Sequence, residues 1–220
     1  MTIQIGENPW ILISLTFLEI LFIIIPPYIA SKIEKTKFKD QLIIIGFHKL
    51  RSLKSEKILE IVSGIGLGVL FWVLAPYLNH FFYFLSQKLF GNEFVQQAEQ
   101  GTISTLPINP SYIQLTIAII QQIFIISICE EAFFRSFLIK KLRNKFKNFS
   151  CILLSSLCFA LYHVPPFLVP SNTLITYFGY YYTFGVLLSL IFILYKDSLL
   201  PAIITHGFFN IIIIIFNIVN

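Results

Sequence analysis

Several apolar runs of about 20 residues constrain this chain more than any other feature, because each is long enough to cross a bilayer as a helix. Only 12% of the 220 residues are charged, against about 25% in an ordinary soluble domain. The runs are continuous and do not alternate in polarity, as the strands of a membrane β-barrel would. The sequence therefore predicts an all-α fold, a polytopic transmembrane helical bundle.

About six spans account for the pattern of apolar and polar segments. They are expected at residues 10–30, 58–84, 112–139, 149–163, 173–195 and 199–218. Two basic segments, 31–57 and 140–147, separate some of these runs, whereas the polar segment 91–110 contains no Lys or Arg. Because cytoplasmic loops carry an excess of Lys and Arg, we expect the basic segments and Lys196 in the cytoplasm. Segment 91–110, interpreted as a loop, and both termini are then expected outside, in an integral, multi-pass membrane protein.

The formal net charge of +5 raises the question of nucleic-acid binding. The basic residues, however, gather between apolar runs, which is typical of cytoplasmic loops and not of a nucleic-acid surface. The three cysteines, Cys129, Cys151 and Cys158, fall within or at the edges of apolar segments. Their spacing fits neither a zinc pair nor a disulfide framework. We therefore predict no nucleic-acid partner and interpret the cysteines as small apolar residues.

Two carboxylates and a guanidinium interrupt the apolar run 112–139, at Glu130, Glu131 and Arg135. A charged residue at the centre of a membrane helix costs about 2.5–3.5 kcal/mol on translocon scales, so such residues usually face a bundle interior or a wet cavity. Glu131 and Arg135 are four residues apart and can form an ion pair along one helix face. Glu130 is rotated by about 100° from Glu131, so the two carboxylates need not have the same role.

Further polar residues lie in other runs: His163 in the fourth, and His206 and Asn210 in the sixth. His206 and Asn210 are four residues apart, which places both on one helix face. At a rise of ~1.5 Å per residue, Glu130 and His206 both lie ~15 Å from the nearest cytoplasmic basic residue, whereas His163 lies ~22 Å away. The matching depths predict a polar cavity within the membrane. His163 comes out somewhat too far toward the outside, so either the fourth span starts later than Phe149 or the site spreads along the membrane normal.

The chemistry of these residues suits the hydrolysis of an amide. A buried carboxylate that has lost its hydration is a better base and can activate a water near neutral pH. A second histidine and an asparagine can donate hydrogen bonds to a developing oxyanion. Simpler interpretations stay open: Glu131 and Arg135 as a structural ion pair, and His206 and Asn210 as hydrogen-bonding contacts between helices. Glu19, a lone carboxylate in the first run, gives only a weak signal for a catalytic role.

Three motifs resemble the CAAX protease and bacteriocin-processing family (CPBP, or Abi) of intramembrane peptidases, which is related to type II CAAX prenyl endopeptidases. The family signature is E-E-x-x-x-R, then F-x-x-x-H, then H-x-x-x-N. Here the motifs stand at residues 130–135, 159–163 and 206–210, so that the resemblance covers about half of the chain. It implies transmembrane helices and loops in residues 1–111 and a catalytic helical core in residues 112–220, within a single membrane domain.

The resemblance implies a role for each motif residue. Glu130 would activate the attacking water, and His163 would help to hold that water. His206 and Asn210 would stabilise the oxyanion. Two supporting residues would orient these groups: Glu131 and Arg135. In this mechanism, in which a glutamate activates the water, no cofactor is expected. A zinc ion bound by Glu130, His163 and His206 is the alternative, although the chain lacks the His-Glu-x-x-His pattern of a better-attested zinc site.

The leading hypothesis is an intramembrane endopeptidase that cleaves a small peptide or a protein tail near the membrane, in contact with membrane lipid. The chain is shorter than the eukaryotic prenyl-protein proteases, which favours a compact prokaryotic-type member in the plasma membrane over an enzyme for prenylated substrates. The alternative is a non-catalytic membrane scaffold or bacteriocin-immunity protein. A small transporter is the least favoured hypothesis, because it needs a polar path through the whole membrane. The sequence carries no signal for the oligomeric state.

Overall fold

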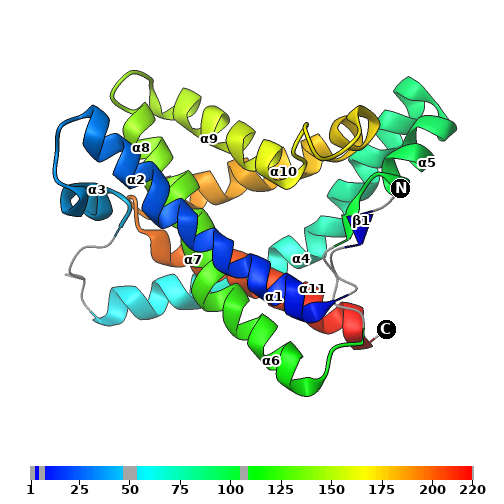
Figure 1. Ribbon diagram of the computed structural model, residues 1–220, viewed down its shortest axis with the longest axis horizontal. Coiled ribbons are helices and arrows are strands. Elements are labelled where there is room, and N and C mark those ends of the chain that lie inside the picture. The colour runs from blue at the N-terminus through cyan, green and yellow to red at the C-terminus, as the bar shows by residue number, and fades with distance from the viewer. Residues whose placement is uncertain (1–2, 5–7, 47–53, 105–108, 220) are drawn as a thin grey trace.

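The computed structural model describes residues 3–4, 8–46, 54–104 and 109–219, and these are almost entirely helical (Figure 1). The described residues also contain a parallel pair of two-residue strands, β1 (Ile3–Gln4) and β2 (Ile103–Ser104). The predicted all-helical architecture is thus confirmed. The predicted segments 31–57 and 91–110 are covered only in part, since 47–53 and 105–108 lie outside the described residues.

The helices follow the apolar runs of the sequence. The first run forms α1 (Pro9–Thr16), the 3₁₀ turn η2 (Phe17–Ile20) and α2 (Leu21–Ile33). It is followed by α3 (Phe38–Ile44), the long α4 (Lys54–Phe90) and α5 (Asn92–Gln100). The third run consists of α6 (Tyr112–Gln121), the π-helical η3 (Gln122–Ile126), α7 (Ser127–Glu131), the π-helical η4 (Ala132–Leu138) and α8 (Ile139–Leu142). The last helices are α9 (Asn148–His163), α10 (Ser171–Leu194) and α11 (Leu199–Val219).

Within the described residues, five helical segments are long and apolar enough to cross a membrane. They are Ile13–Ile33, Ser55–Phe90, Tyr112–Leu142, Ser171–Leu194 and Leu199–Phe216. These segments correspond to five of the predicted spans, and they indicate a multi-pass integral membrane protein. The remaining predicted span is α9, an apolar helix of 16 residues. At ~1.5 Å per residue, α9 is shorter than the ~30 Å hydrocarbon core of a bilayer.

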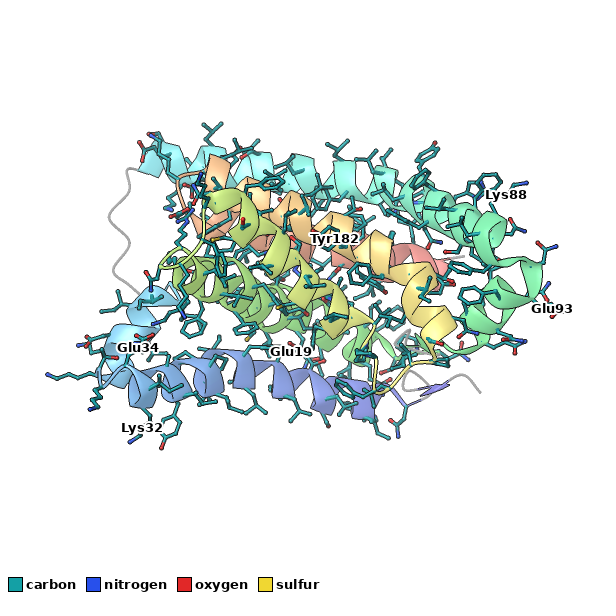
Figure 2. The ribbon with its side chains drawn as sticks, turned by 90° about the horizontal axis from the view of Figure 1, so that it is seen from above. Glu19, Lys32, Glu34, Lys88, Glu93 and Tyr182 are labelled. Atoms are coloured by element: carbon teal, nitrogen blue, oxygen red, sulfur yellow. The ribbon has the colours of Figure 1, made fainter. Side chains whose placement is uncertain are left out.

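The two basic segments meet at one end of the bundle. Lys141 Nζ lies 2.6 Å from Glu34 Oε1, which joins α8 to the end of α2. This hydrogen bond holds the pKa of the exposed Glu34 carboxyl below its usual value. Arg143 forms an ion pair with Asp197, in the turn before α11, with its Nη2 2.9 Å from Oδ1. Figure 2 shows Glu34 at this end and Glu93 at the opposite end. The predicted topology requires the basic segments on the same side, and the two ion pairs bring them there.

The segment 91–110, which we predicted as a loop, contains the helix α5. Val95 and Ala98 are buried on the face of α5 that packs against α10. The Thr173 hydroxyl, at the start of α10, donates a hydrogen bond of 2.8 Å to the Ala98 carbonyl. We did not predict this helix, because the interpretation as a loop rested on the polarity of the segment. Apolar residues three apart give a helix one buried face even when its other faces are polar.

Two glycines of α4 allow it to pack closely along α11. A Cβ added at Gly64 would lie 2.7 Å from Ile204 Cβ, and a Cβ added at Gly68 would lie 3.0 Å from the Thr205 carbonyl oxygen. Small residues are common where membrane helices approach each other in this way. By contrast, a Cβ at Gly66 would meet nothing within 4 Å. Since α4 precedes residue 112 and α11 follows it, the two predicted parts of the chain pack together.

We expect Gly64→Ala to lower the free energy of unfolding by about 1–3 kcal/mol, the usual cost of adding a methyl group to a filled interior. Gly66→Ala is the matched control, because its methyl group enters open space and alanine favours a helix more than glycine does. Unfolding midpoints of the purified proteins in one detergent measure both effects. Equal midpoints for the two variants would contradict the close contact between α4 and α11.

Candidate active site

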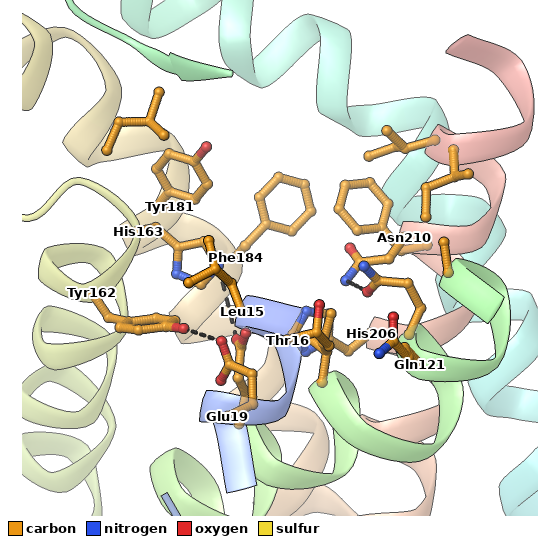
Figure 3. Close-up of a pocket in the computed structure, with 18 of the residues that line it drawn as sticks. Leu15, Thr16, Glu19, Gln121, Tyr162, His163, Tyr181, Phe184, His206 and Asn210 are labelled. Atoms are coloured by element: carbon orange, nitrogen blue, oxygen red, sulfur yellow. Dashed lines mark hydrogen bonds and ion pairs between the residues drawn. The ribbon is translucent and has the colours of Figure 1, made fainter. Parts of the chain in front are cut away.

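A cavity of about 570 Å³ lies between α1, α6, α9, α10 and α11 (Figure 3). All four residues predicted to be catalytic line it: Glu130, His163, His206 and Asn210. Most of the other lining side chains are apolar or aromatic. The two predicted supporting residues, Glu131 and Arg135, are completely buried beside these groups. The structure thus brings three motifs from separate helices to one place.

The two glutamates lie on α7, a short α-helical segment between the π-helical segments η3 and η4. A π-bulge adds one residue to a turn and so rotates the side chains that follow by about 100°, and such bulges are frequent at functional sites. Gln122 is the first residue of the widened η3, and Glu130 follows this segment on α7. Eight residues apart on a regular helix they would point about 80° apart, yet both line the cavity.

Glu130 Oε2 lies 3.9 Å from His163 Nε2. The other ring nitrogen of His163, Nδ1, is 3.0 Å from the carbonyl oxygen of Phe159, one turn earlier on α9. A carbonyl only accepts, so Nδ1 carries the hydrogen and a neutral ring presents Nε2 as an acceptor. Glu130 is 4% exposed, and within the described residues its Oε2 has no hydrogen-bond partner. Glu130 Oε2 and His163 Nε2 are therefore two acceptors that face each other without a direct hydrogen bond.

Glu131 holds two partners at once. Its Oε2 is 3.0 Å from Arg135 Nε, and its Oε1 is 2.8 Å from His206 Nδ1. The guanidinium of Arg135 also lies over the Phe159 ring, 4.3 Å from the ring centroid. We predicted the ion pair with Arg135 but not the hydrogen bond to His206. A carboxylate that accepts from Nδ1 fixes the tautomer and the orientation of an imidazole, so Glu131 sets both for His206.

Asn210 lies one turn after His206 on α11 and faces the same cavity. Its side-chain amide donates a hydrogen bond of 2.8 Å to Gln122 Oε1. An amide NH₂ group has two hydrogens, so the second one is left for an acceptor in the cavity. Gln122 was not among the predicted site residues, and its contact with Asn210 fixes the orientation of that amide.

Comparison with known protein families gives a match over this part of the chain. The family described as type II CAAX prenyl endopeptidase, Rce1-like, matches residues 112–212. This chain carries a domain of that family. No curated protein and no solved structure matches the chain. All six predicted site residues lie within the Rce1-like domain, and the family is one of proteases.

The predicted depth of His163, within the Rce1-like domain, was wrong. Counting residues placed it ~7 Å further toward the outside than Glu130, yet its Nε2 lies 3.9 Å from Glu130 Oε2. Figure 2 shows the yellow-green α9 running diagonally relative to the cyan α4. An inclined helix advances by less than ~1.5 Å per residue along the bundle axis, which reduces the difference in depth.

A zinc ion in the Rce1-like domain would need at least three ligands around one point. Among the residues that the structure describes, no group of three His, Cys, Asp or Glu side chains could hold a metal ion. The proposed zinc ligands, Glu130, His163 and His206, therefore do not fit a metal in this arrangement. The independence from a cofactor stays a prediction.

Two further polar residues reach the cavity, and the motifs did not predict them. Glu19 lies in η2, outside the Rce1-like domain, and the Tyr162 hydroxyl donates a hydrogen bond to its Oε1 (Figure 3). Both side chains line the cavity. In the sequence Glu19 is a lone carboxylate in an apolar run, and its partner is 143 residues away. No local pattern could have connected them.

Proposed function

We propose that this protein is an intramembrane endopeptidase that hydrolyses a peptide bond in a small peptide or a protein tail near the membrane. The observation that carries this proposal is the pair of acceptors, Glu130 Oε2 and His163 Nε2, 3.9 Å apart at the wall of the cavity. The protease family of the Rce1-like domain supports the same chemistry.

A water molecule between Glu130 and His163 would donate one hydrogen to each of them and direct a lone pair toward a scissile carbonyl carbon. As the new C–O bond forms, Glu130 takes a proton from the water, and His163 keeps the water oxygen oriented. The electrons of the carbonyl double bond move to the carbonyl oxygen, which becomes an oxyanion. When the oxyanion collapses, the C–N bond breaks and Glu130 returns its proton to the leaving nitrogen.

The oxyanion needs hydrogen-bond donors that are already in place. Asn210 offers the amide hydrogen that Gln122 does not take. His206 already donates its Nδ1 hydrogen to Glu131, so its Nε2 donates only when the ring is protonated. The Glu131 carboxylate stabilises that charged ring. Glu131 and Arg135 are therefore positioning residues in this mechanism, because they act through His206.

We place the cavity within the membrane, in a bundle of about six spans with the basic segments on the cytoplasmic side of a prokaryotic plasma membrane. The sixth span would be α9. Its first residue, Asn148, accepts a hydrogen bond of 2.9 Å from Arg143 Nε at the basic end of the bundle. The chain that follows α9 enters α10 next to α5, at the opposite end. These contacts connect the two ends of α9 to opposite ends of the bundle and support its assignment as the sixth span.

Purified protein in vesicles, mixed with a library of membrane-tethered peptides, tests the proposed function. We expect cleavage that a strong chelator does not reduce, because the Glu130 carboxylate and not a metal activates the water. A zinc-dependent membrane protease in the same vesicles is the control for chelation. Loss of cleavage with the chelator would indicate a metal site. A protein that cleaves no peptide would favour the alternative, a non-catalytic scaffold or bacteriocin-immunity protein whose polar contacts only join helices.

A further inference from the structure

The cavity contains a second carboxylate that the proposed mechanism does not use. Glu19 enters the cavity from η2, the 3₁₀ turn that interrupts the first apolar run. This turn packs against α7, the segment that carries Glu130. Figure 3 shows Glu19 and Tyr162 pointing toward each other on the side of the cavity where His163 lies, away from Asn210. A residue outside the Rce1-like domain thus contributes to the wall of its cavity.

The contacts of Glu19 leave one of its oxygens without a partner. Its Oε1 accepts a hydrogen bond from the Tyr162 hydroxyl. The Tyr162 ring is itself held by Phe22 and Phe134, at centroid distances of 5.0 and 5.9 Å. Within the described residues, Oε2 is buried and has no hydrogen-bond partner. The carboxylate is therefore fixed in place by one oxygen, while the other is an acceptor that lacks a donor.

The charges around the cavity indicate which donor would fit. Glu131 has Arg135 and His206 as partners, but no Lys or Arg lines the cavity among the described residues. A buried carboxylate is costly unless a cation or several donors compensate it. Because the rest of the lining is mainly apolar, a cationic group on an entering molecule would supply the donor that Glu19 Oε2 lacks.

We propose that Glu19 binds a primary ammonium group of the substrate, from a lysine side chain or a free amino terminus, within an otherwise apolar peptide. Tyr162 is the residue that positions Glu19 for this contact. The inference deepens the proposed function, since it names the class of peptide that the cavity selects.

A binding measurement tests this inference without requiring cleavage. The full-length protein is placed in nanodiscs of phosphatidylcholine, a lipid without a primary amine. Three sets of fluorescent apolar hexapeptides with amidated C-termini are compared: an acetylated series with one lysine moved through each position, an acetylated peptide with norleucine, and the norleucine peptide with a free amino terminus. The first and third sets distinguish the two sources of the ammonium group, and the second is the uncharged reference.

For wild type, we expect at least one ammonium-bearing peptide to bind about tenfold more tightly than the neutral reference, as for a hydrogen bond to a charged group. Glu19→Gln should remove this preference, and Tyr162→Phe should reduce it. Glu93→Gln, which replaces a carboxylate on α5 that does not line the cavity, is the matched control and should keep the preference. Equal unfolding midpoints of the variants show that the fold is intact.

Two outcomes would overturn the inference. One is wild-type protein that binds the neutral and the charged peptides equally well. The other is a Glu19→Gln variant that weakens the binding of both by the same factor, which would indicate a general effect on the cavity. A wild-type protein that binds ammonium-bearing peptides through Glu19 but cleaves none would reject the proposed function and retain this inference, so the two failures are distinguishable.

Discussion

Glu130→Gln should lower kcat for peptide cleavage by about 10²–10⁴-fold, the usual contribution of a general base. The glutamine side chain has nearly the same shape and still reaches His163, but its amide cannot take a proton from water. Single-turnover cleavage of a tethered peptide in vesicles measures the effect separately from substrate binding. The expected result is therefore a loss of rate with little change in the concentration of peptide that saturates the protein.

Glu93→Gln again provides the matched control, since Glu93 lies on α5, away from the cavity. A Glu130→Gln protein that cleaves as fast as wild type would contradict the role of Glu130 as the base. A non-catalytic scaffold makes a different prediction. In that case Glu130→Gln would have no effect in any assay, whereas the loss of a contact between helices, such as that of Glu131 with His206, would lower only the stability.

The spans and the six motif residues could be predicted from the sequence, because apolar runs and the polar residues inside them can each be recognised from a short segment alone. An apolar run of about 20 residues predicts a membrane helix irrespective of its partners. Polar residues inside such runs are few, so that Glu130, His163 and His206 could be grouped before any fold was known. Their placement around one cavity agrees with this grouping, although their catalytic roles stay a proposal.

The remaining features of the site depend on geometry that a sequence pattern does not carry. The widened turns η3 and η4 change which side chains share a face, and regular helical periodicity therefore does not place Gln122 beside Asn210. The tilt of α9 brings His163 to the depth of Glu130, which residue counting could not show. The contact of Tyr162 with Glu19 joins segments 143 residues apart, and only the packed bundle defines it.

Arg135→Met should lower the free energy of unfolding by about 3–5 kcal/mol, the usual cost of removing one partner from a buried ion pair. Arg135 and Glu131 are both 0% exposed, and Arg135 Nε lies 3.0 Å from Glu131 Oε2. Without the guanidinium, the Glu131 carboxylate keeps only the His206 ring as a partner. Methionine is close in length and flexible, so the effect of the lost charge exceeds that of the lost volume. Reversible unfolding in mixed detergent micelles measures the difference.

The double variant Glu131→Gln/Arg135→Met separates the charge from other effects of the substitution. It removes the buried anion together with its cation, and replacing both partners of a buried pair is often nearly neutral. We therefore expect the double variant to be more stable than Arg135→Met alone, while Lys145→Met, at an exposed position after α8, changes stability by less than about 0.5 kcal/mol. A double variant no more stable than the single one would show that Arg135 acts mainly through its packing on Phe159. The recovered stability would instead identify Glu131 as the group that makes Arg135 necessary, and the same carboxylate holds His206 at the cavity.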